Sequence, residues 1–195
     1  MDLPDATRRT VLKTLGVAAG VGALATPAAG HDGGLIGHLS KVWAATYQYM
    51  DSARAYEHGY VVPGPDGVVP LEDVQEMGHA VCGMGYHFVN RDLIGSTDPR
   101  KPQVLAYGVD GDGELTLGAV EYVVPKAGPH ETDPPDLFGH DGGREVWAED
   151  SPQEGVWSLH AWVHAPNPDG MFAAFNPRDE FHPEGCTDPR EAHEE

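Results

Sequence analysis

Three residues on separate apolar segments of this chain have the side chains of a metal-ligand set. His87 lies in "MGYHFVN", Glu121 in "LTLGAVEYVV" and His160 in "VWSLHAWVHA". Burying a carboxylate in an apolar segment is unfavourable unless it is paired or bound to a metal ion. Two histidines and one carboxylate with open positions suit Fe(II), Mn(II) or Zn(II). If the segments are strands of one small β domain, we expect the three side chains to converge on such an ion.

Strand alternation predicts which residues accompany each candidate ligand, because successive side chains point to opposite faces. The face of Glu121 is predicted to carry four apolar residues: Leu115, Leu117, Ala119 and Val123. Alternation also puts Trp162 and His164 on the face of His160. We therefore expect Trp162 to form a wall of the site.

A polar core without a metal ion is the alternative interpretation. Eleven histidines in 195 residues make coincidental placements common, and a buried histidine is usually hydrogen-bonded to a structural partner. Glu121 could instead pair with an arginine. The domain would then be a non-catalytic module that binds a small ligand or an envelope component, or a structural envelope protein. The sequence leaves open whether the protein is an enzyme.

Other site motifs are incomplete. Segment 110–121, "DGDGELTLGAVE", has acidic residues at EF-hand positions, but Leu115 stands where that loop needs glycine. Segment 77–87, "MGHAVCGMGYH", gathers soft ligands, but their order differs from that of a blue-copper site. Segment 77–87 is therefore not expected to be a copper site. Copper is a further candidate ion for His87, Glu121 and His160. A G-x-S-x-G nucleophile elbow and a glycine-rich phosphate loop are both missing from the sequence.

The two cysteines, Cys82 and Cys186, are the only ones in the chain. Outside the cell, two cysteines most simply form one disulfide. Closing a loop of about a hundred residues would stabilise the fold by up to ~4–5 kcal/mol in the chain-entropy model. A thiolate ligand at Cys82 is the alternative.

The composition is strongly acidic, with 12 basic and 31 acidic residues and a formal net charge of −19. Nucleic acid is excluded as a partner because clustered cations are needed to neutralise phosphates. Anionic membrane surfaces are disfavoured for the same reason. Self-repulsion of this charge largely vanishes at ~1 M salt, where the screening length is ~3 Å. The composition therefore indicates a salt-loving source.

Residues 1–30 have the pattern of a twin-arginine signal peptide. Arg8 and Arg9 precede a short apolar stretch, "LGVAAGVGALA", and small residues follow in "TPAAG". The stretch is too short and too rich in glycine for a stable membrane span. We expect the Tat translocase to export the folded chain, which would place it outside the cell or on its surface.

The remaining chain, residues 31–186, is predicted to form one β-rich α+β domain, followed by a polar tail at 187–195. Apolar residues at three- and four-residue steps predict one long helix over residues 35–58. Five later segments, bounded by proline and glycine, are rich in strand-forming residues. They are "CGMGYHFVN", "PQVLAYGV", "ELTLGAVEYVVP", "VWSLHAWVHA" and "GMFAAFNP". Segment 126–155 reads as a long loop, which could cover a site. The pattern favours a small barrel or sandwich, with a cupin-like arrangement among the options.

The order of several motifs resembles that of a family of small exported bacterial and archaeal proteins without an assigned activity. The motifs are A-T-x-x-Y-x-D, G-x-H-x-V-N, V-E-Y-x-V-P, L-H-x-W and N-P-x-G-M-F, within residues 43–186. The resemblance implies that His87, Glu121 and His160 are motif positions and that both cysteines belong to the common framework. It also places Asn90, Trp162, Asn167 and Asn176 at motif positions. We expect four residues to line or support the site: Asn90, Tyr122, Trp162 and Asn167. The resemblance supplies no substrate.

Overall fold

The computed structural model describes residues 34–139, 147 and 155–188. The expected signal peptide, residues 1–30, and most of the expected tail lie outside these residues. The described residues all belong to one compact unit, Asp32–Glu195. Within the described part of the chain, no helix has the length and apolar character needed to cross a membrane.

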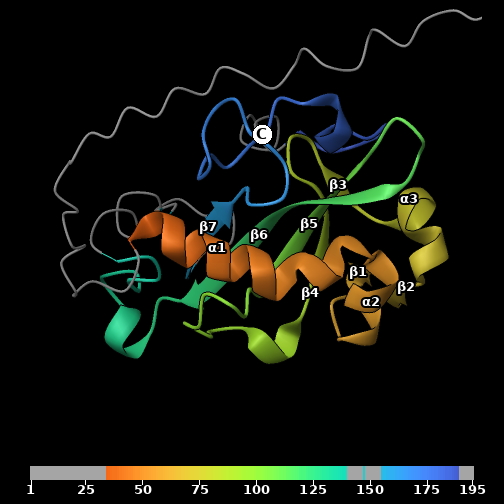
Figure 1. The fold of residues 1–195 in the computed structure, drawn as a ribbon. Helices are drawn as coiled ribbons and strands as arrows, with labels where there is room; N and C mark the ends of the chain where they lie inside the picture. Colours follow the sequence, from red (N-terminus) through yellow and green to blue (C-terminus); the bar gives the residue numbers. More distant parts are fainter. Residues whose placement is uncertain (1–33, 140–146, 148–154, 189–195) are drawn as a thin grey trace, which may run out of the picture. The chain divides into compact units, whose positions relative to one another are not determined.

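The centre of the fold is a five-stranded sheet with the order β3-β4-β5-β6-β7, in which all neighbours are antiparallel. Its strands are β3 (Ala80–Val81), β4 (Gly85–Val89), β5 (Val104–Val109), β6 (Leu115–Pro125) and β7 (Val156–Ala161). The sheet is curled like half a barrel (Figure 1). A small second sheet pairs β1 (Val62–Gly64) with β2 (Gly67–Val69). The predicted β-rich α+β class is confirmed.

The predicted helix 35–58 is present but interrupted. Helix α1 (Leu35–Thr46) continues as the 3₁₀ turn η1 (Tyr47–Met50), and α2 (Ser52–Glu57) follows separately. The break occurs at Asp51, which has extended backbone angles (φ −89°, ψ 110°) and accepts a hydrogen bond from the Ala53 amide. An aspartate in this conformation is a favourable N-cap, so Asp51 starts a new helix instead of continuing the first one.

The other helical segments are short. They are η2 (Leu71–Asp73), α3 (Val74–Met77), η3 (Arg91–Leu93), η4 (Gly128–His130) and η6 (Asp179–Phe181).

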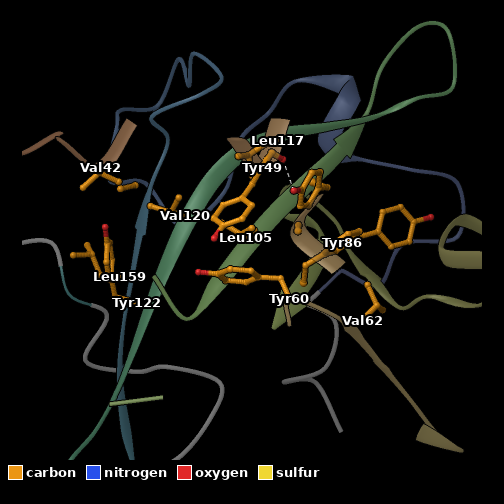
Figure 2. Packing of buried hydrophobic residues seen from close by; sticks show 14 of the residues in the cluster. Val42, Tyr49, Tyr60, Val62, Tyr86, Leu105, Leu117, Val120, Tyr122 and Leu159 are labelled. Atoms are coloured by element: carbon orange, nitrogen blue, oxygen red, sulfur yellow. Dashed lines mark hydrogen bonds between the residues drawn. The ribbon is translucent and has the colours of Figure 1, made fainter. Parts of the chain in front are cut away.

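One face of the sheet carries the main hydrophobic core, and α1 packs on it. Leu39 and Val42 of α1 are buried with sheet residues such as Leu105 and Val120. Figure 2 shows Tyr122 beside Leu159, its register partner on β7, among these residues. The Tyr107 hydroxyl donates to the Tyr49 carbonyl at 2.5 Å and so ties the sheet to η1.

A β-bulge at Gly118 changes which residues share a face on β6. Ala106 pairs with Ala119, while the next residue, Tyr107, pairs with Leu117, so Gly118 has no partner on β5. Leu117 therefore belongs to the main core, whereas Ala119 lies on the opposite face with Trp162. The prediction that Glu121 shares a face with Leu115 and Leu117 is wrong, because the extra residue reverses the alternation.

The segment after β7 is irregular, so the strand predicted for "GMFAAFNP" is absent. This C-terminal segment crosses the second face of the sheet, where Phe181 packs against Trp162 with ring centroids 4.7 Å apart. The two rings form a small buried cluster with Ala106 and Ala119. The second face is therefore covered at this end by two aromatic side chains.

Candidate metal centre

The three predicted ligands lie together on the second face of the sheet, opposite the main core. Glu121 on β6 and His160 on β7 are register partners. His87 on β4 is the partner of Ala106, so it lies two strands away from Glu121. Because Ala106 has only a methyl side chain, the His87 ring can extend over β5 toward Glu121. The curl of the sheet and the short side chain between them bring the three residues together.

The three side chains meet at one carboxylate oxygen. Oε2 of Glu121 lies 3.7 Å from Nε2 of His87 and 3.7 Å from Nε2 of His160. One donor atom from each residue lies within 4.8 Å of the other two. Both 3.7 Å separations are too long for hydrogen bonds. The donors therefore surround a common point without bonding to one another.

The group is largely shielded from water. The exposed fractions of the side chains are 21% for His87, 13% for Glu121 and 6% for His160. Burial lowers the pKa of His160 to about 4. Burial also lowers the pKa of His87, and a nearby charge on His160 or His79 would lower it further, although Glu121 acts in the opposite direction. Both imidazoles are therefore neutral at neutral pH, which is the form that binds metal ions.

Burial raises the pKa of the Glu121 carboxyl, and the neighbouring His87 only partly offsets this effect. The residues that set its pKa thus compensate the negative charge of Glu121 only in part. The predicted alternative of an arginine partner is wrong, because the ion pairs that the described residues make with Glu121 come from the two histidines.

His160 has a buried polar atom whose environment differs from that of most buried polar atoms. Its Nε2 atom is buried and has no hydrogen-bond partner among the residues that the structure describes. Buried polar atoms in folded proteins are nearly always hydrogen-bonded, so each exception needs an explanation. The atom is directed at the point shared with Glu121 and His87, and a metal ion at that point would satisfy it.

Sequence reasoning did not place His79 near this group. Strands β3 and β4 are antiparallel and pair Ala80 with Tyr86. Extending this register by one residue brings His79 opposite His87. A charge on His79 lowers the pKa of His87, which reflects their proximity. Strand alternation is the signal that could have found it. Because Ala80 lies in the main core, its neighbour His79 lies on the opposite face of the sheet.

Four residues were expected to line or support the site. Trp162 is buried on the same face as His87, Glu121 and His160, and its Nε1 atom donates to the Ala173 carbonyl. Tyr122 alternates with Glu121 and points into the main core, where its hydroxyl donates to the Pro99 carbonyl at 2.6 Å. Tyr122 is therefore a core residue and not part of the site.

The two asparagines stabilise chain connections. Asn90 accepts from the Asp92 amide as the cap of η3 and donates to the His58 carbonyl. Asn167 lies in the loop after β7, where it accepts from the Asp169 amide and donates to the Phe175 carbonyl. Their described hydrogen bonds do not reach the three ligands.

His164 lies away from the predicted ligand face, because β7 ends at Ala161 and the chain bends. Its Nε2 atom bonds to the Thr46 hydroxyl of α1 at 2.8 Å. The described part of the long loop also packs on the core side: Phe138 contacts Tyr122, and the His130 carbonyl accepts from Trp157. These residues do not cover the ligands, and His140 lies outside the described residues.

The two cysteines form a disulfide, with Sγ atoms 1.96 Å apart and Cα atoms 5.1 Å apart. The bond joins the turn between β3 and β4 to the C-terminal segment. In this oxidised form Cys82 is not a thiolate ligand.

Comparisons of the chain with protein-family models, curated proteins and solved structures found no match.

Proposed function

We propose that this domain binds a divalent transition-metal ion through His87, Glu121 and His160. The observation that carries the proposal is the buried, unpartnered Nε2 atom of His160, 3.7 Å from the Glu121 oxygen that His87 also faces. An ion at the shared point would bond to all three donors. It would also compensate the negative charge of a carboxylate that is otherwise costly to bury.

The donor types suit Zn²⁺, which binds histidine nitrogen and glutamate oxygen in proteins. Fe(II), Mn(II) and copper use the same donor types and are the competing ions.

Three protein ligands leave at least one coordination position open. Structural zinc sites are usually closed by four protein ligands, whereas catalytic sites keep a position for water or substrate. His87 is the most exposed of the three side chains, at 21%, so a small molecule would approach the ion from its side. We therefore propose that the ion binds an exchangeable water or small ligand, which is the arrangement needed for Lewis-acid chemistry.

A polar core without metal, the competing function, is less well supported. Hydrogen bonds within the group would have to replace the metal bonds, but both histidine–glutamate separations are too long for them. An ion pair would require a protonated imidazole, whereas burial lowers the pKa of both rings.

We propose further that the protein acts outside the cell after export by the Tat translocase. The proposal rests on the arginine pair at Arg8 and Arg9 and the apolar stretch that follows. The Cys82–Cys186 disulfide is compatible with an oxidising environment. Because Tat substrates are exported folded, the metal ion would be selected before export.

Elemental analysis of the full chain, exported through its own leader and purified in molar salt without a histidine tag, tests the metal proposal. We expect about one equivalent of transition metal in the wild type and almost none in His160→Ala. His38→Ala, on the far side of the sheet in α1, should keep its metal. Metal-free wild-type protein that also takes up no added zinc, iron, manganese or copper would contradict the proposal.

A further inference from the structure

A second group of metal-binding side chains lies at the disulfide. Donor atoms of Cys82, Cys186 and His182 all lie within 4.8 Å of one another. His182 is exposed and both cysteines are half-buried, so the group is accessible to small molecules. None of these residues belongs to the site formed by His87, Glu121 and His160.

Backbone hydrogen bonds hold the two cysteine-bearing segments together independently of the disulfide. The Cys82 amide donates to the Thr187 carbonyl, and the Thr187 amide donates to the Ala80 carbonyl, each at 2.9 Å. Gly83 also donates to Phe181 and accepts from the Asn176 amide, each at 2.8 Å. We therefore expect the two sulfur atoms to stay close when the disulfide is reduced.

Of the two ring nitrogens of His182, Nδ1 is the one that would bind a metal ion. Its Nε2 atom lies 3.1 Å from the Asn176 carbonyl oxygen. Because a carbonyl only accepts, Nε2 must carry the proton, which leaves the lone pair on Nδ1. A ligating histidine commonly donates its other ring N–H to a backbone carbonyl in this way.

We propose that the reduced form binds Zn²⁺ through the Cys82 and Cys186 thiolates and His182, with water in the fourth position. Two cysteines and one histidine form a known zinc ligand set. Oxidation reverses binding: the two thiolates lose one electron each and form the protein S–S bond. The two electrons reduce a small-molecule disulfide, whose S–S bond breaks to give two thiolates that take up two protons from water, and Zn²⁺ leaves with its charge unchanged.

Cobalt absorption of the full chain tests this proposal, because a thiolate-to-cobalt charge-transfer band arises only from sulfur ligands. The protein is reduced anaerobically with a phosphine, the phosphine is removed, and Co²⁺ is added. We expect the band in the reduced wild type and its loss on adding excess Zn²⁺ or a small-molecule disulfide. His182→Ala should weaken Co²⁺ binding by ~10-fold or more, while His38→Ala should bind as the wild type does. Circular dichroism of each reduced sample checks that the fold persists.

Absence of the band in folded, reduced protein would overturn the proposal. So would Cys82→Ser with an undiminished band, or His182→Ala with wild-type affinity. Reduced protein that unfolds and does not refold with Co²⁺ would also overturn it, because the backbone hydrogen bonds would then not hold the donors in place. Cobalt bound at His87, Glu121 and His160 gives no sulfur band, so the two sites are tested separately.

Discussion

His160 on β7 and Glu121 on β6 are register partners whose facing atoms, Nε2 and Oε2, lie 3.7 Å apart without a hydrogen bond between them. Burial moves both groups toward their neutral forms, lowering the pKa of His160 to about 4 and raising the pKa of Glu121. Each group is therefore less stable in its charged state than it would be in water. A cation bound between them, as proposed, would stabilise the charged form of the Glu121 carboxylate.

The low pKa of His160 predicts that the metal-free protein loses stability in mild acid. The unfolded chain binds a proton near pH 6.5, whereas the folded chain binds it only near pH 4. The stabilising contribution is thus complete above pH 6.5 and is lost as the pH falls toward 4, by about 3 kcal/mol in total. Urea unfolding in chelator across this range measures it. His160→Asn should flatten the decline and His38→Asn should not; equal slopes in the wild type and His160→Asn would contradict the prediction.

The raised pKa of Glu121 predicts that Glu121→Gln stabilises the metal-free protein at neutral pH. The folded state favours the protonated carboxyl. Its contribution to the free energy of unfolding is therefore fully present below the ordinary pKa of 4.5 and is lost as the pH rises through the raised pKa. Removing the charge should raise the free energy of unfolding by ~1–3 kcal/mol and abolish metal-dependent stabilisation. Thermal melts with chelator and with Zn²⁺ measure both effects. The exposed control, Glu114→Gln, should change neither; a destabilised Glu121→Gln would count against the account.

Gly118, at the β-bulge, lies under the Phe181 and Trp162 rings, so we expect a larger side chain there to displace them. A methyl group there would overlap with the Phe181 ring and crowd Trp162. Gly118→Ala should lower the free energy of unfolding by ~1–3 kcal/mol, the usual effect of overpacking. Gly111→Ala is the matched control, because nothing lies within 4 Å of its added methyl group. Equal stability of the two variants in urea unfolding would mean that the Phe181 ring does not pack tightly on Gly118.

Tyr122 separates a core role from a site role. Its hydroxyl donates to the Pro99 carbonyl on the opposite face from Glu121. Tyr122→Phe should therefore reduce stability by about 1 kcal/mol and leave zinc affinity unchanged. Calorimetric titration of folded protein with Zn²⁺ measures the affinity. A large loss of zinc affinity would mean that Tyr122 contributes to the metal site and is not only a core residue.

The sequence was sufficient to predict that three polar side chains converge, because a buried carboxylate needs polar neighbours. His87, Glu121 and His160 were identified on three segments that form strands in the structure. The faces of β6 were not predictable by strict alternation, because the bulge at Gly118 inserts one residue. A glycine in an apolar strand is the only trace of that bulge in the sequence.

The remaining differences arise from interactions between distant segments. The helix break depends on the Asp51 cap, whose type is visible in the sequence but whose conformation is set by the packing around it. The strand expected at 170–177 does not form, because this segment turns to bring the Asn176 amide to Gly83. His164 bonds to Thr46, 118 positions earlier, and no local pattern predicts that contact.

Anomalous diffraction from crystals of the full chain, soaked in Zn²⁺ and measured at the zinc absorption edge, would locate the ion. We expect a strong peak bonded to Nε2 of His87, Oε2 of Glu121 and Nε2 of His160, and no such peak in His160→Ala crystals. A wild-type map without a peak among these three atoms would contradict the proposed metal site, even if zinc were bound elsewhere on the acidic surface.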